Sequence, residues 1–240
     1  MLCKLCHIEK KLCQSHIIPE SAYGSLYDDK HRFFAVSNIQ KKFNVLQKGL
    51  REPLLCEECE KHLNKYDRYF ADLWYLNGAA PSISKQELIT IDNIEYHRFK
   101  LFHMSILWRA GVASRDEFLA VDLGQHEEKL RNLILGDNPG DPTQYAIFGY
   151  VLASPNDCHV YQSLLAEPVA VDLNHLQGFH FVFGGCAWHY VLASNIDLNE
   201  YPFILQEDGT LNLLRVFIDQ YDPVMDLMKE RIRHGWKKNE

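Results

Sequence analysis

The sequence has no apolar run that approaches the roughly 20 residues of a membrane-spanning helix. It has no internal repeat and no low-complexity tract, and its opening residues, Met1-Leu2-Cys3-Lys4, leave no room for a signal peptide. Its seven cysteines are an odd number, and four of them have metal-type spacing, which is typical of a reducing compartment rather than of a disulfide framework. We therefore expect a soluble, cytoplasmic protein without membrane contact.

Several nucleotide and hydrolase motifs are also missing. The chain contains no Walker motif, no dinucleotide-binding fingerprint and no G-x-S-x-G elbow. It also lacks a basic surplus, because its formal net charge is −7. The charge is uneven: residues 1–75 carry 12 Lys/Arg against 10 Asp/Glu, and residues 76–240 carry 13 against 22. The acidic balance argues against indiscriminate nucleic-acid binding, although Lys10-Lys11, Lys30 to Arg32 and Lys41-Lys42 can still engage a phosphate backbone.

With 240 residues, 47% of them apolar, the chain can bury one core plus a small metal-stapled module. A helix is expected over Glu57 to Leu76, ended by Asn77-Gly78. Its apolar stripe is Leu63, Tyr66, Phe70, Leu73 and Trp74. We place the boundary between an N-terminal module, residues 1–78, and an acidic second domain, residues 79–240, just after this helix.

The second domain is expected to be a mostly antiparallel α+β fold, because strands arrive in runs with few helices between them. The predicted helices are Glu95 to Ala113, Gln125 to Leu135 and Asp222 to His234. The predicted strands are Glu87 to Ile94, Gln144 to Ala153, His159 to Leu164, Pro168 to Leu173, Gly178 to Asn195 split near Gly184-Gly185, and Tyr201 to Leu205, with a hairpin turn at Asp208-Gly209. In the N-terminal module we expect a short helix at Glu20 to Tyr27 and two paired strands, His31 to Val36 and Asn44 to Leu46.

Two C-x-x-C pairs bracket the N-terminal module. They are Cys3/Cys6, called the first knuckle below, and Cys56/Cys59, called the second knuckle. Each pair can present two thiolates to one tetrahedral Zn²⁺, and the second pair opens the predicted helix. This order predicts a structural zinc in a treble-clef shape, in which a knuckle, a hairpin and a helix share one ion. The alternatives are four reduced core thiols, or a site in which Cys13 substitutes for one ligand.

Between the knuckles stands Ser15-His16-Ile17-Ile18-Pro19, and Leu54-Leu55 precedes the second knuckle. A C-x-x-C knuckle, a His-Ile-Ile-Pro segment and a Leu-Leu-Cys-x-x-Cys entry into a helix together resemble the zinc-bracketed HNH endonucleases of the ββα-metal fold. The resemblance covers about residues 1 to 75. It implies hydrolysis of phosphodiester bonds with a catalytic Mg²⁺ or Mn²⁺, with nucleic acid, DNA in particular, as the partner of the N-terminal module. It also implies a place among bacterial restriction or antiphage effectors.

By the family's motif, His16 is the general base that deprotonates water, a role suited to a group with a pKa near 6.5. The sequence departs from the motif at two positions. Ser15 stands where an acidic or histidine metal ligand usually precedes the base, and Glu60 stands where histidine usually follows the second knuckle. Glu60 and Asn64, four residues apart on one helix face, can bind a hard cation, and His62 can assist. The asparagine that orients the base is Asn38 or Asn44.

Each of these residues also has an ordinary structural interpretation. His16 can cap the knuckle or donate to a backbone carbonyl, and Glu60 can be a favourable first-turn carboxylate. The alternative function is therefore a non-catalytic zinc-binding module for nucleic acid or protein, with a degenerate HNH site. In the nuclease interpretation we expect the acidic second domain to restrain, target or sense, with a protein or a ligand as its partner.

Overall fold

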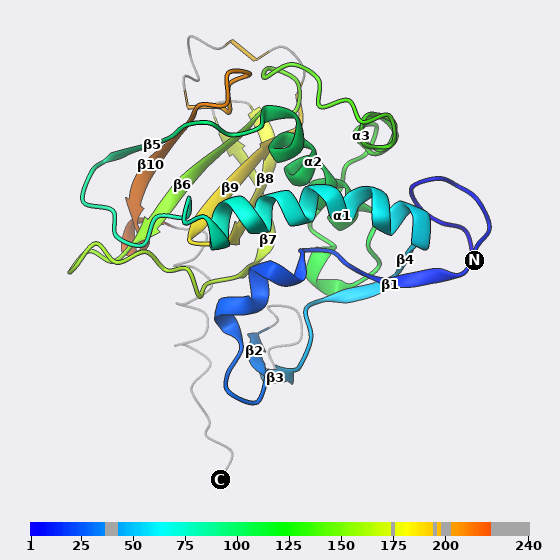
Figure 1. Ribbon diagram of the computed structural model, residues 1–240, viewed down its shortest axis with the longest axis horizontal. Coiled ribbons are helices and arrows are strands. Elements are labelled where there is room, and N and C mark those ends of the chain that lie inside the picture. The colour runs from blue at the N-terminus through cyan, green and yellow to red at the C-terminus, as the bar shows by residue number, and fades with distance from the viewer. Residues whose placement is uncertain (37–42, 174–175, 194–195, 198–202, 222–240) are drawn as a thin grey trace.

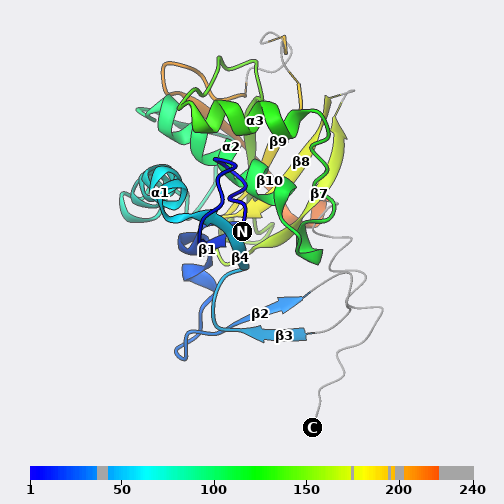
Figure 2. The same cartoon turned by 90° about the vertical axis from the view of Figure 1, so that its right-hand side faces the viewer.

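The computed structural model describes residues 1–36, 43–173, 176–193, 196–197 and 203–221. It is an α+β protein in which helices lie against one mixed sheet, with smaller two-stranded sheets near the N-terminus. Figures 1 and 2 show that α1 (Glu57–Ala71) runs beside α2 (Tyr96–Val112), and that α2 lies next to the strands of the large sheet. The third helix, α3 (His126–Leu135), packs on α2. Within the described residues, none of the helices has the length and apolar character needed to cross a membrane.

The large sheet has six strands in the order β5-β10-β6-β9-β8-β7. These strands are β5 (Leu88–Ile91), β6 (Ile147–Ala153), β7 (Ala166–Leu173), β8 (Leu176–Phe183), β9 (Cys186–Val191) and β10 (Leu211–Phe217). All neighbours are antiparallel except β10 and β6, which run parallel. The predicted split between β8 and β9 is confirmed, because Gly184 and Gly185 both have positive φ, as a tight hairpin turn requires.

Three strand predictions for this domain need correction. The strand β10 was not predicted, and it lies between β5 and β6, two strands that are far apart in sequence. His159 to Leu164 forms only isolated bridges, from His159 to Ile83 and from Val160 to Ala153. Residues 203–205 are not a strand, and the turn at Gly209 follows a loop instead of joining two strands. The predicted helix Asp222 to His234 lies outside the described residues.

The N-terminal part is an antiparallel pair of strands, called the N-terminal hairpin below, followed by a helix. The strand β1 (Leu12–His16) pairs antiparallel with β4 (Arg51–Cys56), and α1 begins directly after β4 and packs on both strands. The chain between them contains a 3₁₀ helix at Glu20–Leu26 and the pair β2 (Phe33–Val36) and β3 (Phe43–Leu46), as the sequence predicted. After Ala71, α1 continues as a π-helix over Asp72–Leu76.

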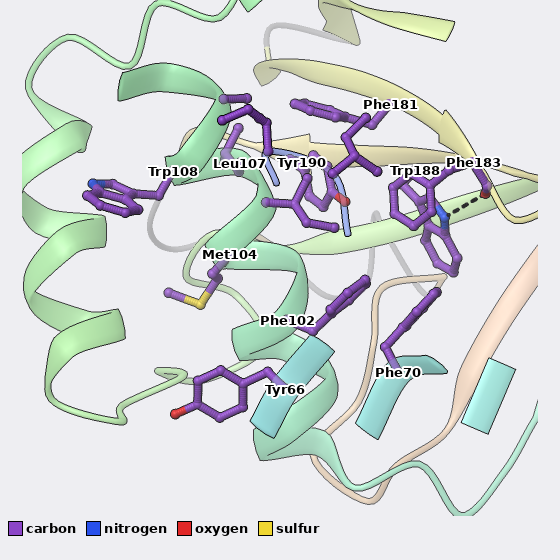
Figure 3. Packing of buried hydrophobic residues seen from close by; sticks show 14 of the residues in the cluster. Tyr66, Phe70, Phe102, Met104, Leu107, Trp108, Phe181, Phe183, Trp188 and Tyr190 are labelled. Atoms are coloured by element: carbon purple, nitrogen blue, oxygen red, sulfur yellow. Dashed lines mark hydrogen bonds between the residues drawn. The ribbon is translucent and has the colours of Figure 1, made fainter. Parts of the chain in front are cut away.

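A single aromatic core joins this N-terminal part to the large sheet, as the stripe on α1 predicted. The ring of Phe70 on α1 stacks on Phe102 of α2 with centroids 3.9 Å apart, and Trp74 meets Trp188 of β9 at 5.2 Å. Figure 3 shows how side chains from α1, α2 and the strands meet in this core. The indole N–H of Trp74 also donates to the carbonyl of Gly184 at 2.9 Å. The two parts therefore share one buried interior.

Candidate functional site

The four knuckle cysteines come together as the sequence predicted. The sulfur atoms of Cys3, Cys6, Cys56 and Cys59 all lie within 4.8 Å of one another, close enough to hold one metal ion. The Cys6 and Cys56 sulfurs are 3.8 Å apart, which equals the edge of about 3.8 Å that four Zn–S bonds of 2.3 Å define in a tetrahedron. Cys13 is not a member of this group. The pairing of β1 with β4 brings the knuckles together, because Leu12 lies opposite Cys56.

Backbone N–H groups prepare this cluster for a cation. The amide of Cys56 donates to the Cys3 sulfur at 3.3 Å. Burial opposes ionisation of Cys3, but the backbone amides of the knuckles, chiefly those of Cys6 and Cys56, lower the pKa of Cys3 to about 7. Burial instead raises the pKa of Cys59. A bound cation would favour the ionised form of all four thiols.

His16 ends β1, and its imidazole lies in a half-buried site among charged groups. Its Nε2 is 2.8 Å from a carboxylate oxygen of Glu20, and 26% of its side chain is exposed. Burial lowers the pKa of His16, and the charges of Arg51 and Arg109 act in the same direction, whereas Glu20 and Glu60 act to raise the pKa. Burial therefore favours the neutral ring, which is the form that can accept a proton.

Glu60 lies in the first turn of α1, and its carboxylate is half-buried. The Oε1 atom of Glu60 is buried without a hydrogen-bond partner. A buried unpartnered carboxylate oxygen is unfavourable unless a water, a cation or a ligand completes it. Asn64 is exposed one turn further along the same face of α1. His62 lies elsewhere, because its Nε2 is 2.9 Å from the carbonyl oxygen of Ile134.

Ser15 does not lie beside a possible cation. Only 1% of Ser15 is exposed, and its hydroxyl accepts a hydrogen bond from the backbone amide of Leu55 at 3.1 Å. The residue before His16 therefore serves the hairpin and not a metal site. The candidate orienting residues Asn38 and Asn44 stay undecided, because Asn38 and the side chain of Asn44 lie outside the described residues.

Three parts of the His16 environment were not identified from the sequence. Arg51 lies directly opposite His16 on β4. Arg109 of α2 donates to the His16 carbonyl at 3.0 Å and forms a two-pronged pair with Asp67 of α1, at 3.0 and 2.8 Å. Glu60, Asn64 and Asp67 recur at steps of four and three, so they lie on one face of α1. Because Arg109 joins Asp67 to the His16 carbonyl, this face is the one that looks toward β1. Only Glu20, four residues after His16, had a signal that local sequence could reveal.

No protein-family model matches the chain, and neither a curated protein nor a solved structure matches it.

Proposed function

We propose that the protein is a metal-dependent endonuclease of the HNH type, which hydrolyses phosphodiester bonds at the N-terminal hairpin and helix. The observation that carries this proposal is the buried, unpartnered Oε1 of Glu60 on the helix face that looks toward β1. His16 lies close enough to Glu60 for the negative charge of Glu60 to act on the pKa of His16 and raise it. A strand that ends at a histidine, paired with a strand that runs directly into a helix, is the arrangement that the family resemblance implies, and Glu60 stands in the helix where the family usually has a histidine.

The donor set suits a hard divalent cation. Mg²⁺ keeps several waters and is commonly held by one or two protein carboxylates together with substrate phosphates. Glu60 would supply the carboxylate, and Asn64 is placed to add an amide oxygen. When bound, Mg²⁺ or Mn²⁺ supplies stabilisation of the charge that develops on the phosphate oxygens and the leaving 3′-oxygen. Arg51, opposite His16, adds a fixed positive charge for the phosphate.

His16 is the general base of this proposal, because burial keeps its ring neutral and a quarter of its side chain remains exposed. The four-cysteine cluster is proposed to hold a structural Zn²⁺ that fixes the start of α1, and with it Glu60. None of the seven cysteines is in a disulfide, which supports a reducing, cytoplasmic location. The acidic second part would disfavour unselective contact with DNA or RNA outside the site.

The test is cleavage of plasmid DNA and of RNA with Mg²⁺ or Mn²⁺, with EDTA as the metal-free control. His16→Ala should abolish cleavage and keep the zinc content, because loss of a general base typically costs about 10² to 10⁴ in rate. His159→Ala, which removes an exposed histidine of the second part, is the matched control and should cut normally.

Glu60 variants test the cation. Glu60→Ala should raise the Mg²⁺ or Mn²⁺ concentration needed for half-maximal rate, and Glu60→His should retain cleavage by restoring the family's usual ligand. If neither the wild-type protein nor Glu60→His cuts any nucleic acid with either ion, catalysis is ruled out. The buried Ser15 would then favour the alternative function, a zinc-stapled binding module.

A further inference from the structure

Glu20 is held in place by contacts from three segments of the N-terminal part. Its Oε2 lies 2.8 Å from His16 Nε2 and accepts the backbone amide of Gly49 at 3.3 Å. Its Oε1 accepts the hydroxyl of Tyr27 at 2.5 Å. Gly49 has no room for a side chain, because an added Cβ would lie 2.6 Å from the ring of Tyr23. The carboxylate of Glu20 is therefore built into its position beside the base.

We propose that Glu20 is the positioning residue of His16, and that it selects the nitrogen of the ring that takes the proton. This inference rests on the proposed nuclease function. With Glu20 at Nε2, the neutral ring carries its proton on Nε2, and the free lone pair is on Nδ1. The Nε2 and Oε2 atoms lie 2.8 Å apart, but the angle of this contact does not suit a hydrogen bond. Such contacts commonly align only in the reacting complex.

In the proposed step, Nδ1 of His16 is the proton acceptor. A water molecule gives one proton to Nδ1 of His16, and its oxygen forms a bond to the phosphorus. The bond from phosphorus to the 3′-oxygen breaks, and the leaving oxygen takes a proton from solvent. The imidazolium that forms on His16 is stabilised by the negative charge of Glu20, as a carboxylate stabilises the histidine of other nucleophile–base–orienter sites.

The charged groups around His16 determine what removal of Glu20 does. Glu20 lies on the 3₁₀ helix, Arg51 on β4, Glu60 on α1 and Arg109 on α2. The two arginines and burial lower the pKa of His16, and Glu20 is the strongest opposing charge. Removing the charge of Glu20 leaves the arginines unopposed on that side, so the pKa of His16 should fall further below 6.5.

The experiment compares the wild-type protein with Glu20→Gln, which keeps the shape and removes the charge, and with Tyr27→Phe, which removes one donor to Glu20. Glu127→Gln, an exposed glutamate in the first turn of α3, is the matched control. Nitrogen-15 and carbon-13 NMR of labelled histidines reports the tautomer and pKa of His16, whose signal is identified by its absence in His16→Ala. Cleavage of plasmid DNA is measured against pH in parallel.

In the wild-type protein, neutral His16 should be protonated at Nε2. In Glu20→Gln the pKa of His16 should fall, the acidic limb of the rate profile should move to lower pH, and the plateau rate should drop about 10- to 100-fold. Tyr27→Phe should change all three in the same direction by less. If Glu20→Gln merely unfolds the protein, it should lose zinc and cleavage rate, and the acidic limb of the rate profile should not move. In that case Tyr27→Phe becomes the variant that tests the proposal.

The failures are distinguishable. If Glu20→Gln cuts at the wild-type rate with an unmoved limb and an unchanged His16 pKa, Glu20 has no positioning role and the nuclease proposal stands. If the wild-type protein cuts nothing with Mg²⁺ or Mn²⁺, the nuclease proposal fails and the base role of His16 fails with it. In that case the NMR titration still measures the pairing, and a His16 protonated at Nδ1 would contradict it directly.

Discussion

The guanidinium of Arg109 on α2 donates two hydrogen bonds to the carboxylate of Asp67 on α1, at 3.0 and 2.8 Å. It also donates to the backbone carbonyl of His16. One side chain of the second part therefore ties together the helix and the strand that carry the candidate site. Only 3% of the Arg109 side chain and 18% of the Asp67 side chain are exposed. The site is consequently not confined to the N-terminal hairpin and helix.

Asp67→Asn should destabilise the protein by about 3 to 5 kcal/mol, because it leaves the Arg109 guanidinium buried without its counter-charge. Denaturant unfolding measures this loss. Asp72→Asn is the matched control, since Asp72 forms only an exposed contact of 3.9 Å with Arg68 and should change stability by less than about 1 kcal/mol. Equal effects from the two variants would mean that the Arg109 pair contributes nothing beyond a surface pair.

Removal of the knuckle metal should unfold the N-terminal hairpin. Purified protein should contain close to one zinc per chain, and Cys56→Ser should lose it, because metal binding in such small sites supplies folding free energy of about 10 kcal/mol or more. Elemental analysis measures the zinc, and far-ultraviolet circular dichroism measures the fold. Cys13→Ser is the control and should keep the metal, since Cys13 is not in the cluster. A folded wild-type protein without zinc would contradict the proposal.

The aromatic core between the N-terminal part and the large sheet should contribute to the free energy of unfolding of both. Trp74 is fully buried between Phe70 and Trp188, so Trp74→Ala should lower the free energy of unfolding by about 3 to 5 kcal/mol. Leu76, two residues on, is 78% exposed, and Leu76→Ala should have little effect. If Trp74→Ala leaves the melting temperature unchanged, the two parts do not depend on each other for stability.

Much of this fold can be predicted from local pattern, and the reasons are physical. The helices α1, α2 and α3 have apolar positions at steps of three and four, and the β8–β9 turn has the two glycines that its positive φ angles require. In contrast, β10 was missed because Leu214 and Arg215 break the apolar alternation that Leu211, Asn212 and Leu213 begin. Its partners also lie far away in sequence, with Leu213 opposite Gly149 of β6 and Ile89 of β5.

The candidate site divides in the same way. The four cysteines were predicted because the spacing within each pair is a local property, and the pairing of β1 with β4 brings the two pairs together. Asp67 and Arg109 were not, because they approach His16 only through the packing of α1 and α2. Ser15 departs from the family's ligand pattern in the sequence, and in the structure its side chain is turned into the hairpin, where its hydroxyl accepts the Leu55 amide.

Buried histidines predict that stability falls in acid. Burial lowers the pKa of His180 to about 4 and that of His189 to about 3, and the pKa of fully buried His103 is also far below its usual range. In the unfolded chain each takes up a proton near pH 6.5, while the folded protein does not. Stability is therefore complete above about pH 7 and declines as the pH falls from 6.5 toward 4, by about 1.4 kcal/mol per pH unit for each histidine.

Denaturant unfolding at pH 7, 6 and 5 measures this slope. His189→Phe should make the decline shallower, because one buried titrating group is gone, whereas His159→Ala, at an exposed position, should leave it unchanged. A stability that is independent of pH between 7 and 5 would show that the buried rings are protonated in the folded state.

The last prediction concerns Ser15, where the family pattern and the structure give opposite expectations. If residue 15 faced a cation, Ser15→Asp would add a ligand beside the base and speed cleavage. The Ser15 hydroxyl instead lies in the hairpin interior, bonded to the Leu55 amide. We therefore expect Ser15→Asp to bury a carboxylate, to lower stability and to bring no gain in cleavage rate.

The pH dependence separates this cost from a general loss of packing. Burial should raise the pKa of the new carboxyl above its unfolded value near 3.9, so the neutral acid is tolerated at low pH and the charged form is not. The stability difference between Ser15→Asp and wild-type protein should consequently be larger at pH 7 than at pH 5. Ser15→Ala, which removes only the acceptor for the Leu55 amide, should cost about 1 to 3 kcal/mol at both pH values. Faster cleavage by Ser15→Asp at unchanged stability would instead place residue 15 at the cation.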